Sequence, residues 1–109
     1  MIIDTDVNVC ALYEYQQALK RAEVKESLCY ITVGTGVGVG LIINGRCVHG
    51  TLHPEGGHVF VPRDARDADF KGVCPFHDDC VEGMATNVSI KERLGLASVD
   101  DIPSLSDEH

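Results

Sequence analysis

Residues 28–43, with the sequence LCYITVGTGVGVGLII, decide the fold class of this chain. Both ends of the stretch are rich in β-branched, aliphatic and aromatic residues, which are typical of strands. Asn44-Gly45 follows directly and is a strong signal for a two-residue hairpin turn. We therefore expect a β-meander with strands at Leu28–Val33, around Leu41–Ile43 and at Arg46–His49, within an α/β fold.

Four glycines alternate with other residues between the first two predicted strands, at positions 34, 36, 38 and 40. Glycine lets a backbone approach a ligand closely, and consecutive N–H groups in such a turn can bind phosphate, with Thr35 adding a hydroxyl. The dinucleotide pattern does not fit, because its spacing fails and a strand follows instead of a helix, and the Walker pattern fails because no Lys follows the last Gly. Two interpretations stay open: a phosphate-contacting turn, or a tight β-hairpin without a ligand.

Helical patterns flank the meander. Apolar residues recur with a roughly helical period from Val7 to Arg21, after capping residues at positions 4–6, and Glu82 to Leu94 is helical by composition. A further short strand is expected at Val59–Val61. The apolar contacts of the second helix are expected from Met84, Val88, Ile90 and Leu94.

The chain has 109 residues, which suffices for one small domain. We expect one continuous portion over residues 1–96, opening with the apolar run Met1–Ile3, and a flexible Ser/Asp-rich tail over residues 97–109. The net charge of −8 argues against nucleic acid or an anionic membrane as a partner, although a nucleotide substrate remains compatible with it. No secretory signal pattern opens the chain, and a cytoplasmic location is expected.

The segment CPFHDDC, residues 74–80, places two thiols and an imidazole three residues apart. Cys74, His77 and Cys80 can converge on one metal ion, and zinc prefers such donors in a tetrahedral site. His58 is the best fourth ligand, with His53 as the competitor. The alternative is that these cysteines are small buried hydrophobes. Core positions are expected for the remaining cysteines, without a disulfide framework: Cys10, Cys29 and Cys47.

Carboxylates gather around these motifs. Asp4 and Asp6 precede the first helix, where they can cap it, or one of them can act as a general base. Glu55 and Glu82 lie beside the metal-ligand segments, where a rigid loop could hold them as acceptors for vicinal hydroxyls. Surface charge is the alternative role for all of them.

The chain resembles the ROK sugar kinases, most closely their bacterial fructokinase branch, in four motifs that follow the family's order. The glycine run alone would be a weak signal, but the four together are highly specific. They are DTDVN at residues 4–8 with ALYE at 11–14, GTGVG at 34–38, HPEGGH at 53–58, and CPFHDDCVEG at 74–83.

The resemblance implies a partial actin-like ATPase (ribonuclease H-like) fold, with flanking helices and a zinc loop on the β-meander. It implies Asp6 as the catalytic base toward the γ-phosphate of ATP, which Mg²⁺ accompanies. Hexose contacts would come from Glu55, His58 and Glu82, and structural Zn²⁺ would be held by His58, Cys74, His77 and Cys80. Nucleotide contacts would come from Gly34, Thr35, Gly36 and Gly38.

The sequence departs from the family pattern in several places. Thr5 replaces an Asn that contacts the sugar in many members, and Cys-x-x-His-x-x-Cys replaces a more Cys-rich spacing; the fructokinase-like branch carries both changes. Thr86-Asn87 stands where small residues and Gly are usual, which affects a helix start. The phosphate-clamping Asp-x-Gly-Gly-Thr motif is absent from the 109 residues, which indicates a fragment that lacks the first lobe and the C-terminal nucleotide segments.

The leading functional prediction is ATP-dependent phosphorylation of a hexose, fructose to fructose 6-phosphate, as part of a fuller kinase. The isolated chain is expected to be inactive. The expected partners are ATP and fructose, with a homodimer or a separately encoded N-terminal kinase piece as further partners. The alternative is a catalytically inactive zinc-binding remnant or interaction module of a truncated or split gene. A sugar-sensing repressor ranks last, because no helix-turn-helix precedes the sugar motifs.

Overall fold

The structure is a computed structural model that describes residues 4–23, 26–98 and 100. The predicted apolar run Met1–Ile3 and most of the predicted tail lie outside these residues. The described chain forms two compact units. The first comprises the residues up to Thr32 together with Gly38–Gly56, and the second comprises Val33–Val37 and the residues from Gly57 onward. That residues 1–96 form one functional portion stays a prediction.

The first unit opens with helix α1 (Asp6–Lys20), close to the predicted Val7–Arg21. Thr5 caps it: its backbone is extended and its hydroxyl accepts a hydrogen bond from the Asn8 amide at 3.3 Å. The buried residues of α1 recur three or four apart, as expected for a helix with one face on a core. They are Val7, Asn8, Ala11, Tyr15 and Ala18.

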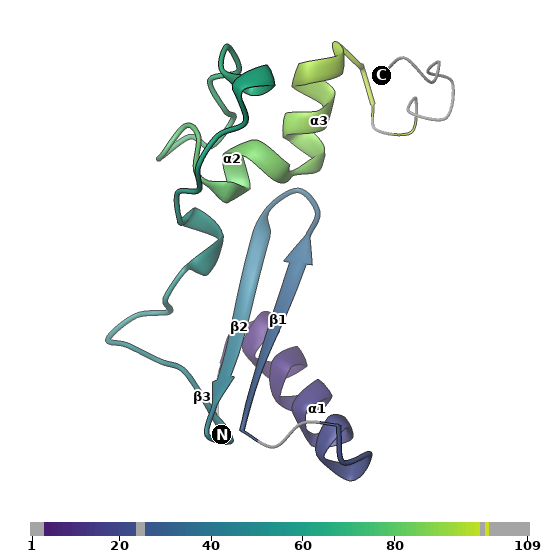
Figure 1. The fold of residues 1–109 in the computed structure, drawn as a ribbon, viewed down its shortest axis with the longest axis vertical. Helices are drawn as coiled ribbons and strands as arrows, with labels where there is room; N and C mark the ends of the chain where they lie inside the picture. Colours follow the sequence, from purple (N-terminus) through teal and green to yellow (C-terminus); the bar gives the residue numbers. More distant parts are fainter. Residues whose placement is uncertain (1–3, 24–25, 99, 101–109) are drawn as a thin grey trace. The chain divides into compact units, whose positions relative to one another are not determined.

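A three-stranded sheet follows, in the order β1 (Ser27–Val33), β2 (Val37–Ile43), β3 (Arg46–Cys47) (Figure 1). Ile43 pairs with Arg46, so Asn44 and Gly45 form a two-residue turn. Their φ angles of 49° and 76° are those of a type I′ hairpin, which confirms the predicted meander. The last strand is shorter than predicted and ends at Cys47 instead of His49.

The glycine run divides between a turn and a strand, because β2 begins at Val37. Gly34 to Gly36 form the turn, with Gly34 N donating to Gly36 O at 2.9 Å. Gly38 and Gly40 lie within β2 against α1; a Cβ at Gly38 would stand 2.6 Å from Val7 Cγ1. These two glycines therefore let the helix lie close to the strand.

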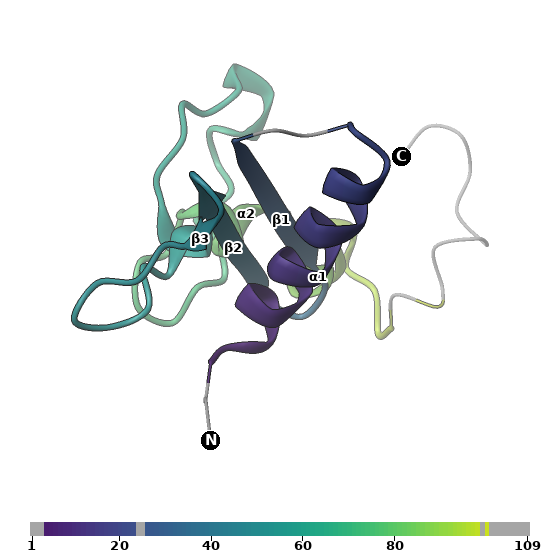
Figure 2. The same cartoon turned by 90° about the horizontal axis from the view of Figure 1, so that it is seen from below.

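The core of the first unit lies between α1 and one face of the sheet, which Figure 2 shows running side by side. Ala11 and Ile42 are fully buried and Tyr15 nearly so. Three partly buried residues pack against them: Leu28, Tyr30 and Cys47. The prediction of a core position is therefore supported for Cys47. It is wrong for Cys10, which lies off the buried stripe of α1, and for Cys29, whose neighbours Leu28 and Tyr30 take the helix-facing side.

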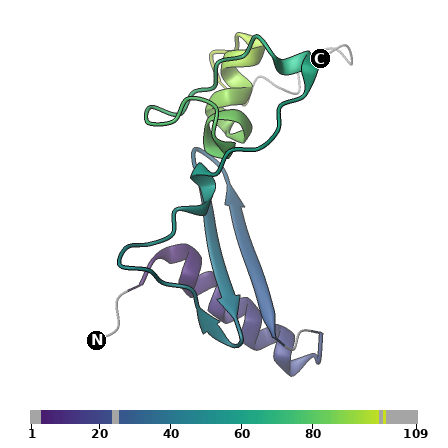
Figure 3. The same ribbon diagram turned by 60° about the vertical axis from the view of Figure 1, so that its left-hand side comes forward.

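The second unit contains mostly irregular chain and short helices: η1 (Gly56–His58, which the unit boundary divides), η2 (Ala65–Asp67), α2 (Val81–Ala85) and α3 (Asn87–Leu94). Figure 3 follows the irregular segment from η1 to α2. The single helix predicted over Glu82–Leu94 is broken at Thr86, whose ψ of 168° is extended. Thr86 then caps α3 by accepting from Ser89 N at 3.4 Å.

Two further sequence predictions for this unit need correction. Val59–Val61 is not a strand; Val59 O instead accepts a hydrogen bond from Val81 N at the start of α2. Among the predicted apolar contacts, Val88 is 42% exposed, because the break at Thr86 rotates the helical stripe, whereas Met84, Ile90 and Leu94 are partly buried. Within the residues described, no helix combines the length and apolarity needed to cross a membrane.

Candidate metal centre

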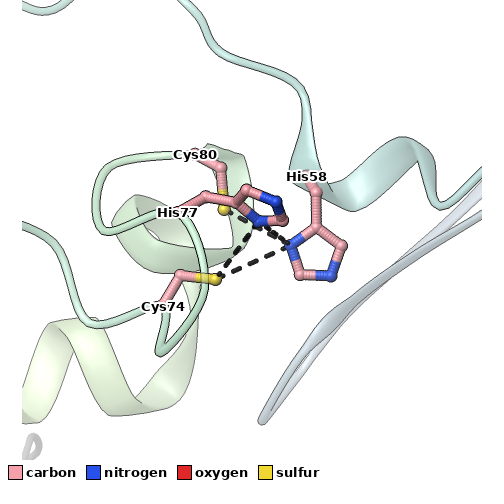
Figure 4. Close-up of side chains that lie close together, drawn as sticks. All are labelled: His58, Cys74, His77 and Cys80. Atoms are coloured by element: carbon pink, nitrogen blue, oxygen red, sulfur yellow. Dashed lines mark hydrogen bonds between the residues drawn. The ribbon is translucent and has the colours of Figure 1, made fainter.

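Four side chains converge in the second unit, three from the turn before α2 and one from η1 (Figure 4). The members are Cys74, His77, Cys80 and His58, and their ligand atoms all lie within 4.8 Å of one another. This is the predicted set of four; the competitor His53 is not a member. The sequence prediction of which residues meet is therefore matched by the geometry.

Four of the six donor separations in this cluster are close to those of a tetrahedral metal site. Metal–nitrogen and metal–sulfur bonds of about 2.0 and 2.3 Å require about 3.3 Å between two nitrogen donors and about 3.6 Å between nitrogen and sulfur. His58 Nδ1 lies 3.2 Å from His77 Nδ1, 3.6 Å from Cys74 Sγ and 3.5 Å from Cys80 Sγ. Cys74 Sγ is 3.8 Å from His77 Nδ1. These four residues can therefore hold a metal ion.

The backbone of the turn is closed by its own hydrogen bonds. Cys74 N donates to Asp78 O at 3.2 Å, and Asp78 N donates back to Cys74 O at 3.0 Å. Asp78 has a φ of 50°, and Gly72 has a φ of 86°. A side chain at Gly72 or Gly83 would collide with the Asp78 carbonyl, so these glycines let the neighbouring chain pack against the closed turn.

The protonation of the two thiols differs. Burial raises the pKa of Cys74, but hydrogen bonds from the Phe76 and His77 amides and from the His77 ring outweigh it, so the pKa falls to about 6. The pKa of Cys80 is raised, chiefly by burial. Cys74 is thus the thiol that more readily supplies the thiolate needed by a metal.

Glu82 lies beside this cluster in the first turn of α2. Its Oε2 accepts a hydrogen bond from Val37 N at 3.0 Å, and its Oε1 stands 3.9 Å from His58 Nε2. The adjoining glycine turn is also attached to α3, through a 2.9 Å bond from Asn87 N to Gly34 O. Thr35 lines a small cavity of about 120 Å³ with six other residues: Val73, Cys74, Pro75, Glu82, Thr86 and Val88.

The remaining predicted site residues belong to the first unit. Asp6 is the first residue of α1 and is exposed; its carboxylate accepts from Val7 N at 2.8 Å. Glu55 is exposed and has a φ of 53°, which is uncommon for a residue with a side chain. Their roles in catalysis and hexose contact stay predictions.

Sequence analysis missed a polar network at the start of α1. Asp4 accepts from Asn8 Nδ2 at 2.7 Å and lies 2.8 Å from His49 Nε2. The hydrogen bond from Asn8, and then that with His49, hold the pKa of Asp4 below its ordinary value. Asn8 is 1% exposed. Asp4, His49 and His53 line a cavity of about 360 Å³ with Thr5, Gly50, Thr51 and Leu52. The four-residue spacing of Asp4 and Asn8 was the sequence signal that could have predicted their contact.

The chain is similar in sequence to bacterial fructokinases. The chain is 44% identical over 95 residues to a fructokinase of Zymomonas mobilis, covering 87% of this chain and 31% of that protein. It is 44% identical over 94 residues to a fructokinase of Streptococcus mutans, covering 84% of this chain and 31% of that protein. The chain thus spans about a third of the length of these relatives.

A solved structure agrees with the sequence relatives. The ROK hexokinase of Thermus thermophilus matches 84% of this chain and 30% of its own, with a TM-score of 0.61 and 28% identity. The α/β fold described above is therefore similar to that of a ROK hexokinase. Residues 1–103 match the sequence profile of the ROK family. The chain belongs to the ROK family, as the profile match, the fructokinase relatives and the structural likeness together show.

Proposed function

We propose that this chain supplies the hexose-recognition and catalytic-base segment of an ATP-dependent hexose kinase, with fructose as the substrate and fructose 6-phosphate as the product. The parent fold is the actin-like ATPase fold. The relatives named fructokinase support the reaction class, and the substrate is proposed from them.

One observation carries the proposal: His58 ends the HPEGGH motif and is also the fourth member of the His/Cys cluster that could hold a metal ion. The candidate hexose motif is therefore attached to the candidate metal site through a shared side chain. Zinc is the proposed metal, because two thiols and two imidazoles at tetrahedral separations suit it best. Bound there, zinc would supply a structural clip and would take no part in the chemistry.

The chain's own residues take the following proposed roles. Asp6 accepts the proton of the hexose hydroxyl that attacks the γ-phosphate, as a positioned carboxylate does in phosphoryl transfer. Glu55 and Glu82 accept hydrogen bonds from sugar hydroxyls, and His58 adds a contact. The nucleotide phosphates, with Mg²⁺, meet the glycine turn.

We narrow the proposed nucleotide contacts to part of the glycine run. Gly34, Thr35 and Gly36 form the turn itself, whereas Gly38 packs against Val7, and the Val37 amide already donates to Glu82. Thr35 and Gly36 therefore carry the proposed phosphate contact. Gly38 serves the approach of α1 to β2.

A chimera tests the proposal. Residues 4–96 of this chain would replace the matching segment of the Zymomonas mobilis fructokinase, and phosphorylation of fructose by ATP would be measured. We expect turnover by the chimera and its loss in the Asp6→Asn variant, because the amide cannot accept the proton. An Asp69→Asn variant, which changes an exposed carboxylate, is the matched control and is expected to remain active.

Two results would contradict the proposal. One is a folded, zinc-loaded chimera without turnover. The other is an Asp6→Asn chimera as active as its parent, which would remove the assigned base.

A further inference from the structure

Glu82 makes two different contacts with its two carboxylate oxygens. One oxygen accepts the Val37 amide, at the point where the glycine turn becomes β2, at 3.0 Å. The other faces the Nε2 atom of His58 at 3.9 Å, within ion-pair range but beyond hydrogen-bond distance. The side chains of His58 and Glu82 are 20% and 26% exposed, so both contacts are partly shielded from water.

The donor atom of His58 determines what Glu82 faces. His58 presents Nδ1 to the two sulfurs and to His77. A neutral imidazole that gives Nδ1 to a metal carries its proton on Nε2, and that N–H needs an acceptor. Among the described residues, the carboxylate that faces this atom is Glu82, at 3.9 Å. A carboxylate that accepts from such an N–H fixes the tautomer of a metal-bound histidine and raises its basicity.

The glycine turn is shaped around the same carboxylate. A Cβ atom at Gly36 would stand 2.9 Å from Glu82 Oε2, so the carboxylate occupies the space that a side chain would need. Because Val37 N is committed to Glu82, the position of the turn follows the position of this carboxylate. Asn87 N holds the other end of the turn through Gly34 O.

We propose that Glu82 is a positioning residue that couples occupancy of the metal centre to the geometry of the glycine turn. A metal held by His58 Nδ1 would leave the ring proton on Nε2, and that N–H would orient the Glu82 carboxylate, which accepts from the Val37 amide. This role differs from the hexose contact proposed above. It rests on the proposed occupation of the cluster by zinc, but not on kinase activity.

A zinc titration of the 109-residue chain, followed by two-dimensional ¹H–¹⁵N NMR and by competition with a colorimetric chelator, tests the coupling. In the unchanged chain, zinc is expected to place the His58 proton on Nε2, to shift the Val37 amide resonance and to slow its hydrogen exchange. In Glu82→Gln, the amide oxygen can still accept from Val37, but the negative charge facing His58 is lost. Zinc affinity should fall by about 10- to 100-fold, the usual effect of removing an outer-shell partner.

Glu92→Gln is the matched control, because Glu92 is an exposed residue of the same type in α3. It should bind zinc as the unchanged chain does and keep the Val37 response. Glu82→Gln should show a Val37 resonance that no longer follows the zinc concentration. If Glu82→Gln fails to fold, the unchanged chain alone tests the coupling, because the coupling requires its Val37 amide resonance to respond to zinc.

The outcomes separate this inference from the proposed function. Stoichiometric zinc binding with an unresponsive Val37 amide, or equal affinities of Glu82→Gln and the unchanged chain, would overturn the coupling and leave the kinase proposal intact. Failure of the unchanged chain to bind zinc would overturn both. A chimera without turnover, in a protein that shows the Val37 response, would overturn only the kinase proposal.

Discussion

Removing the metal should unfold the second unit before the first. The buried hydrophobic residues described in the second unit are Val37, Cys74 and Cys80, and two of these three are proposed ligands. Burial of a valine side chain stabilises a fold by about 1.5–3 kcal/mol. This is small against the conformational entropy that the residues of the second unit lose on folding. A structural zinc at a concentration 1,000-fold above its Kd adds about 4.1 kcal/mol. A bound zinc would therefore contribute more than the one buried valine described in this unit.

The first unit has its own core of Ala11, Tyr15 and Ile42 and is expected to stay folded without the metal. Hydrogen exchange resolved by peptide mass spectrometry would compare the zinc-loaded chain with and without a chelator. Peptides from residues 57–98 should lose protection, whereas peptides from α1 and β2 should keep most of theirs. Restoring zinc should restore protection, and magnesium should not. Equal protection of residues 57–98 with and without chelator, or simultaneous loss over both units, would refute this reasoning.

Three further predictions concern single residues and the isolated chain. The 109-residue chain alone should phosphorylate fructose no faster than its Asp6→Asn variant in a coupled ATP assay; faster turnover would mean that it carries a complete phosphate clamp. Ile42→Ala should lower the free energy of unfolding in urea by about 2–5 kcal/mol, as substitutions at fully buried positions do. Ile31→Ala, at a site 59% exposed, should lower it far less. Similar losses would argue against the core described. Because the pKa of Asp4 is lowered in the folded state, its carboxylate stabilises the fold at neutral pH, and this stabilisation is lost as pH falls through the folded-state pKa. Asp4→Asn should therefore flatten the acid limb of a curve of Tm against pH. An unchanged limb would contradict the network with His49.

Local signals predicted the elements that depend on neighbours in the chain. The bounds of α1 follow from its cap at Thr5 and its apolar period, and the Asn44-Gly45 turn follows from two residues that tolerate positive φ. The membership of the His/Cys cluster was also predictable, because three of its residues lie within one turn and His58 belongs to a recognisable motif. In each case the deciding residues are close in sequence or chemically distinctive.

The failed predictions depend on distant residues. Cys29 lies in an apolar strand, but α1 covers only the sheet face that carries its neighbours, so the thiol is exposed. The composition of residues 82–94 is helical throughout, yet Thr86 prefers to cap a new helix. His49 meets Asp4 across 45 positions, a separation over which no local pattern gives a signal.

The two glycines between Glu55 and His58 explain why the candidate hexose motif needs its sequence. A Cβ at Gly56 would stand 2.9 Å from Val39 Cβ, and a side chain at Gly57 would collide with the Val37 carbonyl. Val37 and Val39 lie two residues apart on β2, so both glycines are set by the same strand. The strand thus fixes the backbone between a candidate sugar-binding carboxylate and a candidate metal-binding imidazole. Because the Glu82 carboxylate also accepts a hydrogen bond from Val37 N, the candidate metal and phosphate elements of the second unit both depend on Val37.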